Sequence, residues 1–520
     1  MWCAADWPRE ESARFPGGKV LRDSSGRILR VTLDEQGRDC RPTYAADPED
    51  WIVKALVAAE DGEFWRHRGV RPGSVLRAAW QNLRGGRRVS GASTITMQAV
   101  RLIRPHPKTF LWKAREAVMA VKMERERDKL WIVSQYLNRA PFGANLVGIE
   151  AAAEGWFGHP AKSLGLGEAA LLAGIVQAPS RFRPDRALDR ALARRDYVLA
   201  RMLALGLADA DQVAAAKAVR PRVVAERRPF RAPHYCDWAL AAGCDGSALD
   251  PEAQEICERA VADAARRGGY DVAAVVVRAA DGEVEAMASS GDYFGGGDCA
   301  QVNTAVARRS AGSTLKPFLA ELAMELGYAE PGDLMDDSPR DYSGWRPQNF
   351  DGYFRGEVTM RDALVMSLNI PFVDLLSRIG VDRFAGRLVD LGFAGVVEPY
   401  ADYGLGLAVG DVEVSALELA RAYRRFAGAE RGSPAHAVYE MLSGPERSQP
   451  ALGHVADALL PRFAWKTGTS SAWGDAWTVL WDSRRVVAVW CGHAAGRFGD
   501  ESIVGLTAAA PVAWSIARQL

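Results

Sequence analysis

Three short motifs in the C-terminal half of the sequence bring hydroxyl and amine groups together at fixed spacing. They are Ser313-Thr314-Leu315-Lys316, Ser367-Leu368-Asn369 and Lys466-Thr467-Gly468-Thr469-Ser470. At the start of a helix, Ser313 and Lys316 would lie one turn apart on one face, so an amine kept neutral by burial could take the serine proton. A lone SxxK pair is common by chance. All three motifs in this order indicate an enzyme that works through an acyl-serine intermediate.

The residues around these motifs also suit acyl transfer. Gly312 precedes the serine and permits a close approach of another backbone segment. On a strand edge, Lys466 to Thr469 would present hydroxyl groups to a substrate carboxylate and a backbone N–H to the developing oxyanion. We therefore expect Thr467, Gly468 and Thr469 to contact the substrate.

A second candidate site lies in the N-terminal half, between Glu60 and Glu116. From Phe64 to Arg115 there is no Asp or Glu, although Lys+Arg and Asp+Glu balance at 65 each over the whole chain. The cations of this span are Arg66, Arg68, Arg71, Arg77, Arg84, Arg87, Arg88, Arg101, Arg104, Lys108, Lys113 and Arg115. Such a run indicates either a solvated basic face or a surface for an anion. The carboxylates at its ends favour the second interpretation, because chemistry at a sugar with a phosphate leaving group needs both signs of charge close together.

Composition limits the class of protein. An apolar content of 48% and a charged content of 25% are typical of globular proteins, and 520 residues predict two or three domains. The zero net charge gives no indication of nucleic-acid binding. The seven cysteines show no CxxC spacing and no pairing with histidine, which argues against a zinc site. No run approaches the roughly 18 to 20 apolar residues of a membrane-spanning helix, and no signal peptide precedes the first charged residues.

The elements that must position the N-terminal site are mostly helical. Apolar segments at 20–23 and 28–33 flank Ser24-Ser25-Gly26 and predict a hairpin. Apolar spacing then predicts helices over 51–59, 113–123, 130–137, 169–176 and 191–205. Residues 219–250 lose this periodicity and are interrupted by prolines, which predicts a linker.

The pattern beyond residue 250 adds strands. A helix over 252–267 precedes strands over 272–278 and 284–288, and further strands are predicted over 476–481 and 486–490, with a closing helix over 512–518. This order predicts an α/β layout with one antiparallel sheet. We therefore expect an N-terminal segment with a hairpin (1–45), a mainly α domain (46–218), a linker (219–250) and an α/β domain (251–520).

With both sets of motifs in place, the chain resembles the class A bifunctional penicillin-binding proteins, most closely those of the 1C type. The glycosyltransferase motifs of that family match here as Glu60-Asp61 with Phe64, His67 and Gly69, as Gly91-Ala92-Ser93-Thr94-Ile95-Thr96-Met97-Gln98, as Lys113 with Glu116, and as Tyr136-Leu137-Asn138-Arg139-Ala140-Pro141-Phe142-Gly143. The sequence segments typical of the 1C type are Asn138 to Phe142, Gln301-Val302-Asn303 and Trp345-Arg346-Pro347-Gln348-Asn349-Phe350-Asp351. The resemblance covers nearly all of residues 18 to 515.

The resemblance implies a mainly α, lysozyme-like peptidoglycan glycosyltransferase domain followed by an α/β penicillin-binding transpeptidase domain. Glu60, as a buried carboxylate, would be the base that deprotonates the acceptor sugar in an inverting transfer from lipid II, an undecaprenyl-diphosphate donor. Glu116 and Lys113 would attend the pyrophosphate with a divalent cation, Mg²⁺ or Mn²⁺, and the arginines would hold the growing glycan strand. The residues assigned to substrate binding in this domain are Asp61, Phe64, His67, Ser93, Thr94, Thr96, Gln98, Arg101 and Lys113.

In the second domain the resemblance implies that Ser313 attacks the penultimate D-alanine carbonyl of a stem peptide, with Lys316 as its base. Ser367 and Asn369 would help to protonate the leaving amine, and β-lactam antibiotics would bind at the same site. No cofactor is implied for the transpeptidase. The catalytic residues assigned over both domains are Glu60, Glu116, Ser313, Lys316, Ser367, Asn369 and Lys466, and no metal ligand is assigned.

The resemblance also carries expectations about location. It implies the cytoplasmic membrane, with the catalytic domains on the periplasmic side, contact with the membrane surface and with other cell-wall synthesis proteins, and no nucleic acid. We expect the family's N-terminal anchor and the extra C-terminal domain of many 1C-type proteins to be absent from this chain. Two residues depart from the family's pattern. Trp112 stands where an arginine often precedes Lys113, which removes one cation from the pyrophosphate, and Arg101 stands where a lysine is common.

Simpler alternatives remain for several residues and for the whole function. His67 could be an ordinary surface or core histidine, and Ser93 and Thr94 could merely cap a helix. Tryptophans at 65, 80 and 112 are more often core residues than ligand-stacking ones, although an indole also suits a membrane interface. The alternative functions are a glycosyltransferase whose second domain only binds or hydrolyses stem peptides, and a non-catalytic cell-wall scaffold. A scaffold has no need to keep every titratable group of both sites.

Overall fold

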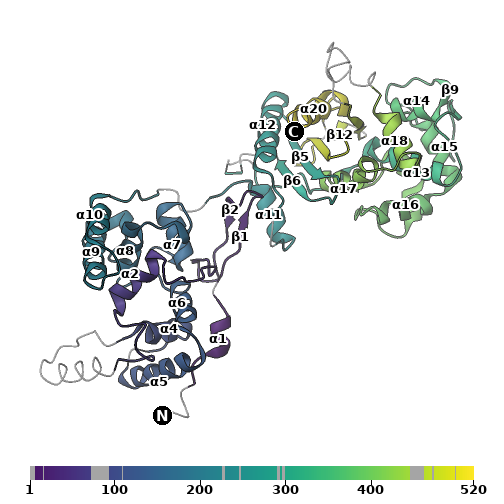
Figure 1. Ribbon diagram of the computed structural model, residues 1–520. Helices are drawn as coiled ribbons and strands as arrows, with labels where there is room; N and C mark the ends of the chain where they lie inside the picture. The colour runs from purple at the N-terminus through teal and green to yellow at the C-terminus, as the bar shows by residue number, and fades with distance from the viewer. Residues whose placement is uncertain are drawn as a thin grey trace, which may run out of the picture. The chain divides into compact units, whose positions relative to one another are not determined.

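The chain folds into two compact units, each with its own core. The computed structural model describes residues 6–15, 17–71, 93–107, 109–224, 229–244, 247–289, 293–294, 299–444, 462–470, 473–497 and 499–520. The N-terminal unit comprises Met1–Val20 and Arg30–Phe230, and the C-terminal unit comprises Leu21–Leu29 and Arg231–Leu520 (Figure 1). Several residues singled out above lie outside the described residues, namely Arg77, Trp80, Arg84, Arg87, Arg88, Gly91, Ala92 and Lys108.

The N-terminal unit is built mainly from helices. They are α1 (Arg9–Ala13), α2 (Trp51–Glu60), α4 (Ile95–Ile103), α5 (Phe110–Glu126), α6 (Lys129–Leu137), α7 (Ile149–Phe157), α8 (Leu166–Ile175), α9 (Pro184–Ala204) and α10 (Ala210–Ala218). The apolar helices α2 and α8 pack against each other and against α9 in the core of the unit (Figure 1). Two short strands, β3 (Asp39–Cys40) and β4 (Leu146–Val147), pair in parallel. The predicted helices are thus confirmed, with ends that extend by a few residues.

Helix ends place the candidate residues of this unit. Helix α2 ends at Glu60, because Asp61 adopts an extended φ of −156°. Helix α4 begins after Thr94, whose side chain accepts a hydrogen bond from the Met97 N–H. Thr109 caps α5 in the same way, and Lys113 therefore lies in the first turns of that helix.

The C-terminal unit is organised on a five-stranded antiparallel sheet in the order β11-β12-β13-β5-β6. Its strands are β5 (Asp271–Arg278), β6 (Val284–Ser289), β11 (Ala464–Thr469), β12 (Asp475–Trp481) and β13 (Arg485–Gly492). Val272, Ala274 and Val276 lie in one hydrophobic cluster, and Ala273, Val275 and Val277 lie in another. Both faces of the sheet are therefore buried, which explains the continuous apolar runs of these strands. Helices α12 and α20 pack on one face and α17 on the other (Figure 1).

The remaining elements surround this sheet. The helices are α11 (Pro233–Ala241), α12 (Pro251–Gly268), α13 (Lys316–Glu325), α14 (Met360–Val365), α15 (Ile370–Ile379), α16 (Val381–Asp390), α17 (Ala416–Ala427), α18 (Pro434–Leu442), α20 (Ala510–Ala517) and the 3₁₀ segments η2 (Gly312–Leu315) and η3 (Tyr400–Val409). The minor strand pairs are β1 (Val20–Arg22) with β2 (Ile28–Val31), β7 (Arg309–Ser310) with β10 (Glu413–Val414), and β8 (Leu334–Asp337) with β9 (Gly356–Thr359). The predicted α/β layout with one main antiparallel sheet is confirmed.

Two expectations about the connecting segments need correction. The expected linker 219–250 contains a helix, α11, which forms because Tyr235, Cys236 and Ala239 are buried in the core of the C-terminal unit. The hairpin is present, but it does not belong with the rest of residues 1–45. Leu21 and Leu29 are buried in the same core, so residues 21–29 group with the C-terminal unit. No helix among the described residues is long and apolar enough to cross a membrane.

Candidate active sites

Glu60 is held by a hydrogen-bonded pair of side chains from two other helices. Gln98 on α4 donates from Nε2 to Glu60 Oε2 at 2.9 Å, and the Tyr136 hydroxyl on α6 donates to Gln98 Oε1 at 3.4 Å. Burial raises the pKa of Tyr136 well above its ordinary value, so the phenol stays a donor. Glu60 itself is only half-buried, not buried as predicted, because it is the last residue of α2. A carboxylate that is both oriented and accessible suits a general base.

Asp61 joins the loop after α2 to the start of α4. Its side chain is buried, and Oδ2 accepts a hydrogen bond from the Ile95 N–H at 3.1 Å. The same oxygen lies 2.8 Å from His67 Nε2, and Arg71 Nη1 lies 3.8 Å from Oδ1. A negative charge at a helix N-terminus is favourable. Asp61 and His67 therefore position α4, which carries Gln98.

Three residues that were predicted to bind substrate are fully buried. Thr94 Oγ1 donates to the Gly69 carbonyl at 2.6 Å while it caps α4, and Thr96 donates to Glu124 on α5. Phe64 has no exposed surface either. A substrate cannot reach these side chains. The two hydroxyl groups form hydrogen bonds within the protein, and the phenylalanine ring packs in the core. The capping alternative is the better interpretation of Thr94.

Glu116 on α5 is the centre of a cluster of positively charged groups. Lys113 Nζ donates to Glu116 Oε1 at 3.2 Å and also to Ser93 Oγ, and Arg101 Nη1 lies 3.9 Å from Oε2. The Glu116 side chain is 1% exposed, whereas those of Lys113 and Arg101 are 40% and 33% exposed. The surface of the cluster is therefore cationic, and it offers an anion at least two charged donors.

Carboxylates from outside the acid-free span reach part of it in space. Arg71 Nη2 lies 2.7 Å from a Glu63 oxygen, and Arg104 Nε donates to Glu11 on α1 at 3.0 Å. Arg66 and Arg68 are exposed. The predicted basic groove is thus partly neutralised among the described residues, and the cluster around Glu116 holds the cations best placed for an anion.

In the C-terminal unit, two glycines let η2 pack directly against β11. Gly312 has a φ of +52°, and a Cβ there would lie 2.8 Å from the Thr469 carbonyl oxygen. A Cβ on Gly468 would lie 2.8 Å from Thr314 Cγ2. The expected close approach at Gly312 is confirmed. It places Ser313, in η2, beside Thr467 and Thr469 on the edge strand of the sheet.

Lys316 is the first residue of α13 and is completely buried. Its Nζ donates to the Ser367 carbonyl at 2.7 Å and to Asn369 Oδ1 at 2.6 Å. Burial lowers the pKa of this amine to about 7, although the charge of Asp337 raises it. Near neutral pH a large part of the amine is therefore uncharged, as a base for Ser313 requires.

Ser367 lies between the two buried lysines of the motifs. Its hydroxyl accepts a hydrogen bond from Lys466 Nζ at 2.7 Å, and its carbonyl accepts from Lys316. Its φ of +60° is in the left-handed region, which costs a non-glycine residue about 1–3 kcal/mol and is typical of functional sites. The arrangement gives the Ser367 hydroxyl a donor on one side and leaves its own proton free to be given.

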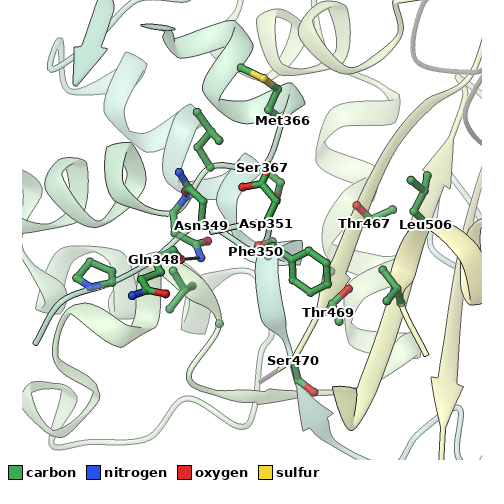
Figure 2. A pocket seen from close by; sticks show the side chains of 18 of the residues that line it. Gln348, Asn349, Phe350, Asp351, Met366, Ser367, Thr467, Thr469, Ser470 and Leu506 are labelled. Carbon is green, nitrogen blue, oxygen red and sulfur yellow. Dashed lines mark hydrogen bonds between the residues drawn. The ribbon is translucent and has the colours of Figure 1, made fainter. Parts of the chain in front are cut away.

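These groups open into one cavity of about 880 Å³. Its lining includes Ser313, Ser367, Asn369, Thr467, Gly468 and Thr469, with Trp345, Phe350 and Trp473 at the apolar parts. Figure 2 shows Ser367 and Asn349 on one wall, facing Thr467 and Thr469 on the other. The structure thus brings the three C-terminal motifs together at one site.

Comparison with known proteins gives one family match in each half of the chain. The profile described as Transglycosylase matches residues 26–203, and that of the Penicillin binding protein transpeptidase domain matches residues 272–450. The chain is 37% identical over 530 residues to penicillin-binding protein 1C of Escherichia coli (strain K12), with 96% of this chain and 68% of that protein covered. The chain belongs to the class A penicillin-binding proteins.

Other relatives of this penicillin-binding protein cover different shares of their own length. Penicillin-binding protein 1F of Bacillus subtilis (strain 168) is 31% identical, with 79% of this chain and 60% of that protein covered. Penicillin-binding protein 1A of Aquifex aeolicus is 28% identical, with 96% and 86% covered. The crystal structure of penicillin-binding protein 1A from Haemophilus influenzae matches the fold with a TM-score of 0.54 at 16% identity, covering 97% of this chain and 92% of that one.

Sequence reasoning missed a histidine in the transglycosylase site of this penicillin-binding protein. His106 Nε2 lies 3.3 Å from Glu116 Oε2, and the imidazole stacks on Trp112 with ring centroids 4.9 Å apart and planes 11° apart. Trp112 stands where the family often has arginine, and its ring thus holds the imidazole of His106 beside Glu116. The Pro105-His106-Pro107 sequence within the acid-free span was the available signal.

The residues around Glu116 do not fit a metal site supplied by the protein alone. One carboxylate faces the side chains of Lys113, Arg101 and His106, whereas Mg²⁺ and similar ions need several oxygen ligands. Over the described ranges there is no group of three or more His, Cys, Asp and Glu side chains placed to hold a metal ion.

Proposed function

We propose that this penicillin-binding protein polymerises lipid II into glycan strands at the N-terminal site and cross-links their stem peptides at the C-terminal site. The observation that carries the proposal is that one chain holds two complete reactive sets. Glu60 is oriented by Gln98 on α4, the helix that also carries Arg101 of the cationic cluster. The buried Lys316 donates to Ser367 and Asn369, which line the same cavity as Ser313.

In the first reaction, Glu60 takes the proton from the acceptor sugar hydroxyl as that oxygen attacks the anomeric carbon of the donor. The bond from this carbon to the pyrophosphate oxygen breaks, and undecaprenyl diphosphate leaves with the electron pair. One displacement inverts the configuration at the anomeric carbon. Lys113 and Arg101, the partly exposed cations beside Glu116, would stabilise the charge that develops on the pyrophosphate.

A divalent cation, Mg²⁺ or Mn²⁺, belongs to the proposal only as a partner of the substrate. Among the described residues, Glu116 is the carboxylate of its cluster, and it contacts Lys113. If such a cation takes part, the pyrophosphate oxygens supply most of its ligands, and no step depends on it here.

In the second reaction, the neutral Lys316 amine takes the proton of Ser313 Oγ, which attacks the carbonyl of the penultimate D-alanine. The backbone beside Thr469 stabilises the oxyanion, and the terminal D-alanine leaves after its nitrogen receives a proton through Ser367. The amine of a second stem peptide then attacks the acyl carbon, the bond to Ser313 Oγ breaks, and the proton lost by the amine returns to Ser313 Oγ through Lys316. β-Lactams acylate the same serine and stop at this stage.

The lipid substrate places this work at a membrane. The polyprenyl chain of the donor lies in the bilayer, and the family implies that both units act on the periplasmic side of the cytoplasmic membrane. Trp65 and Leu111 support contact with a lipid surface, because both are exposed apolar side chains near the first and third motifs. We also propose other cell-wall synthesis proteins as partners, because they act on the same glycan strands at the same membrane.

Two assays test the two halves separately. A fluorescent penicillin should label the wild type covalently and should not label Ser313→Ala, whereas absence of label on the wild type would overturn the transpeptidase half. Lipid II should be polymerised by the wild type and not by Glu60→Gln. Normal polymerisation by the Gln variant would show that Glu60 is not the base. Release of D-alanine without cross-linked product would favour a second domain that only hydrolyses stem peptides.

A further inference from the structure

A buried carboxylate lies behind the transpeptidase site. Asp337, the last residue of β8, has no exposed surface. Asn349 donates from Nδ2 to both of its oxygens, at 2.9 Å and 2.8 Å, and the Arg355 N–H donates to Oδ2 at 2.9 Å. Asn349 belongs to the Trp345–Asp351 segment that the sequence singled out, and the proposed reaction gives that segment no role.

Asn349 also forms a hydrogen bond with Asn369. Since Asp337 accepts hydrogen bonds only, it fixes the Asn349 Nδ2 side, and Asn349 Oδ1 must point the other way. That oxygen accepts the Asn369 N–H at 2.7 Å. Next to it in sequence, the Gln348 carbonyl accepts from Asn369 Nδ2 at 2.6 Å.

The orientation of the Asn369 amide follows from these contacts. A carbonyl oxygen at position 348 can only accept, so Asn369 must turn Nδ2 toward it and Oδ1 toward Lys316. Oδ1 accepts from Lys316 Nζ at 2.6 Å. The chain of contacts therefore runs from Asp337 through Asn349 and Asn369 to the amine that serves as base.

We propose that Asp337 and Asn349 are positioning residues for acyl transfer, which hold the Asn369 amide and through it the Lys316 amine beside Ser313. The proposal rests on the transpeptidase half of the proposed function. It differs from a merely structural role, in which the pair would only tie the 349–355 segment to β8, because it makes the protonation of Lys316 depend on the charge at 337.

The charges around Lys316 make it possible to distinguish a positioning role from a structural one by measuring the pKa of Lys316. Asp337 from β8 and Lys466 from β11 are charged groups on the Ser367 side, and Asp337 raises the pKa of Lys316. Arg355 is a further cation near Asp337, and its pKa is raised by a hydrogen bond to Asp351 and by the charge of Asp337. The acidic groups further along α13 face arginines instead, namely Glu321 with Arg425 and Glu325 with Arg387. Removal of the charge at 337 destabilises the ammonium form, so the pKa of Lys316 falls.

A charge-swap experiment tests the proposal. Acylation by a fluorescent penicillin is measured against pH for the wild type, Asp337→Asn, Asn349→Asp and the double variant. Asn349→Asp leaves two carboxylates facing each other, and Asp337→Asn removes the carboxylate that accepts from Asn349 Nδ2 through both of its oxygens. Acylation at pH 7 should fall about tenfold or more in each single variant. In the double variant, the amide introduced at position 337 can donate to the carboxylate introduced at position 349. That carboxylate can still accept the Asn369 N–H, but it also faces the Tyr353 carbonyl, to which Asn349 Nδ2 donates at 2.8 Å. The rate should therefore recover only in part, to at least about threefold above that of Asn349→Asp.

The pH profile separates positioning from stability. The acid limb of Asp337→Asn should move to lower pH than that of the wild type, and it should move back up in the double variant. Asp336→Asn is the matched control, because Asp336 is a partly exposed neighbour on β8 that pairs with Arg340, and its acylation should be unchanged. Thermal melting and polymerisation of lipid II by the same samples show whether each variant is folded.

The outcomes distinguish the two proposals. Wild-type protein that takes no label refutes the transpeptidase function itself. If the wild type is labelled and the single variants acylate at the same rate, the positioning role is wrong. It is also wrong if Asp337→Asn is folded and the acid limb of its pH profile does not move. If Asp337→Asn does not fold, the comparison of Asn349→Asp with the double variant decides. A double variant no faster than Asn349→Asp then contradicts the proposal.

Discussion

At the scale of single residues, Lys316 determines when the transpeptidase can react. It makes two hydrogen bonds through Nζ, both to neutral acceptors, and its burial lowers the pKa to about 7. The base-competent neutral amine is therefore present above this pKa and is lost as the pH falls through it.

This titration predicts a pH dependence. The rate of acylation by penicillin should be nearly constant above about pH 8 and should fall about tenfold per pH unit below about pH 7. Stopped-flow or quenched labelling between about pH 5 and pH 9 measures it. A flat profile over this range would show that Lys316 is not the base. A rate that still rises about tenfold per pH unit at about pH 9 would show that burial does not lower the pKa of the base to about 7.

His106 is the residue-scale test of the transglycosylase site. His106→Gln removes the imidazole that lies between Trp112 and Glu116, and the KM for lipid II should rise several-fold with a smaller change in kcat. His159→Gln is the matched control, since His159 contacts Glu168 away from this cluster. Equal effects of the two changes on KM would show that His106 does not contribute to binding the lipid II donor.

At the scale of elements, the contact between η2 and β11 determines the geometry of the serine. Gly312→Ala would place a Cβ 2.8 Å from the Thr469 carbonyl at a φ of +52°, so η2 must move away from the strand. Gly327→Ala provides a matched control, because Gly327 has a φ of +71° with no atom within 4 Å of its Cβ position.

Both alanine variants carry the backbone strain of about 1–2 kcal/mol, but only one carries the clash. Penicillin acylation should fall more than about tenfold in Gly312→Ala and should stay at the wild-type rate in Gly327→Ala. Thermal melting should show a loss of stability in both variants, larger in Gly312→Ala because the clash adds to the strain. Equal acylation by the two variants would mean that the close packing of η2 on β11 does not set the position of Ser313.

Sequence patterns predicted the elements better than the side-chain environments. Strands 272–278 and 476–481 and the helix at 51–59 were predictable because their apolar spacing is local. The half-exposure of Glu60 and the burial of Thr94 were not, since they depend on helices far apart in sequence. Motifs located the reacting groups. They missed His106 and Asp337 because the partners of these residues, Glu116 and Asn349, are brought to them only by the fold.

At the scale of the whole molecule, the two proposed activities belong to separate compact units. Glu60 and its partners lie in the N-terminal unit, and all three C-terminal motifs lie in the other. The chain spans 68% of the length of the Escherichia coli relative and 60% of that from Bacillus subtilis. Loss of one reaction by a point change should therefore leave the chemistry of the other unit intact.

The most direct test of this account is the analysis of products formed from lipid II in a membrane-mimetic detergent. After digestion with a muramidase, the wild type should yield cross-linked muropeptides with an equivalent release of D-alanine. Ser313→Ala should yield only uncross-linked muropeptides from a normal polymer. Glu60→Gln should yield no polymer, although it still takes up penicillin. Normal polymer from Glu60→Gln, or cross-linked muropeptides from Ser313→Ala, would contradict the assignment of the two reactions to these two sites.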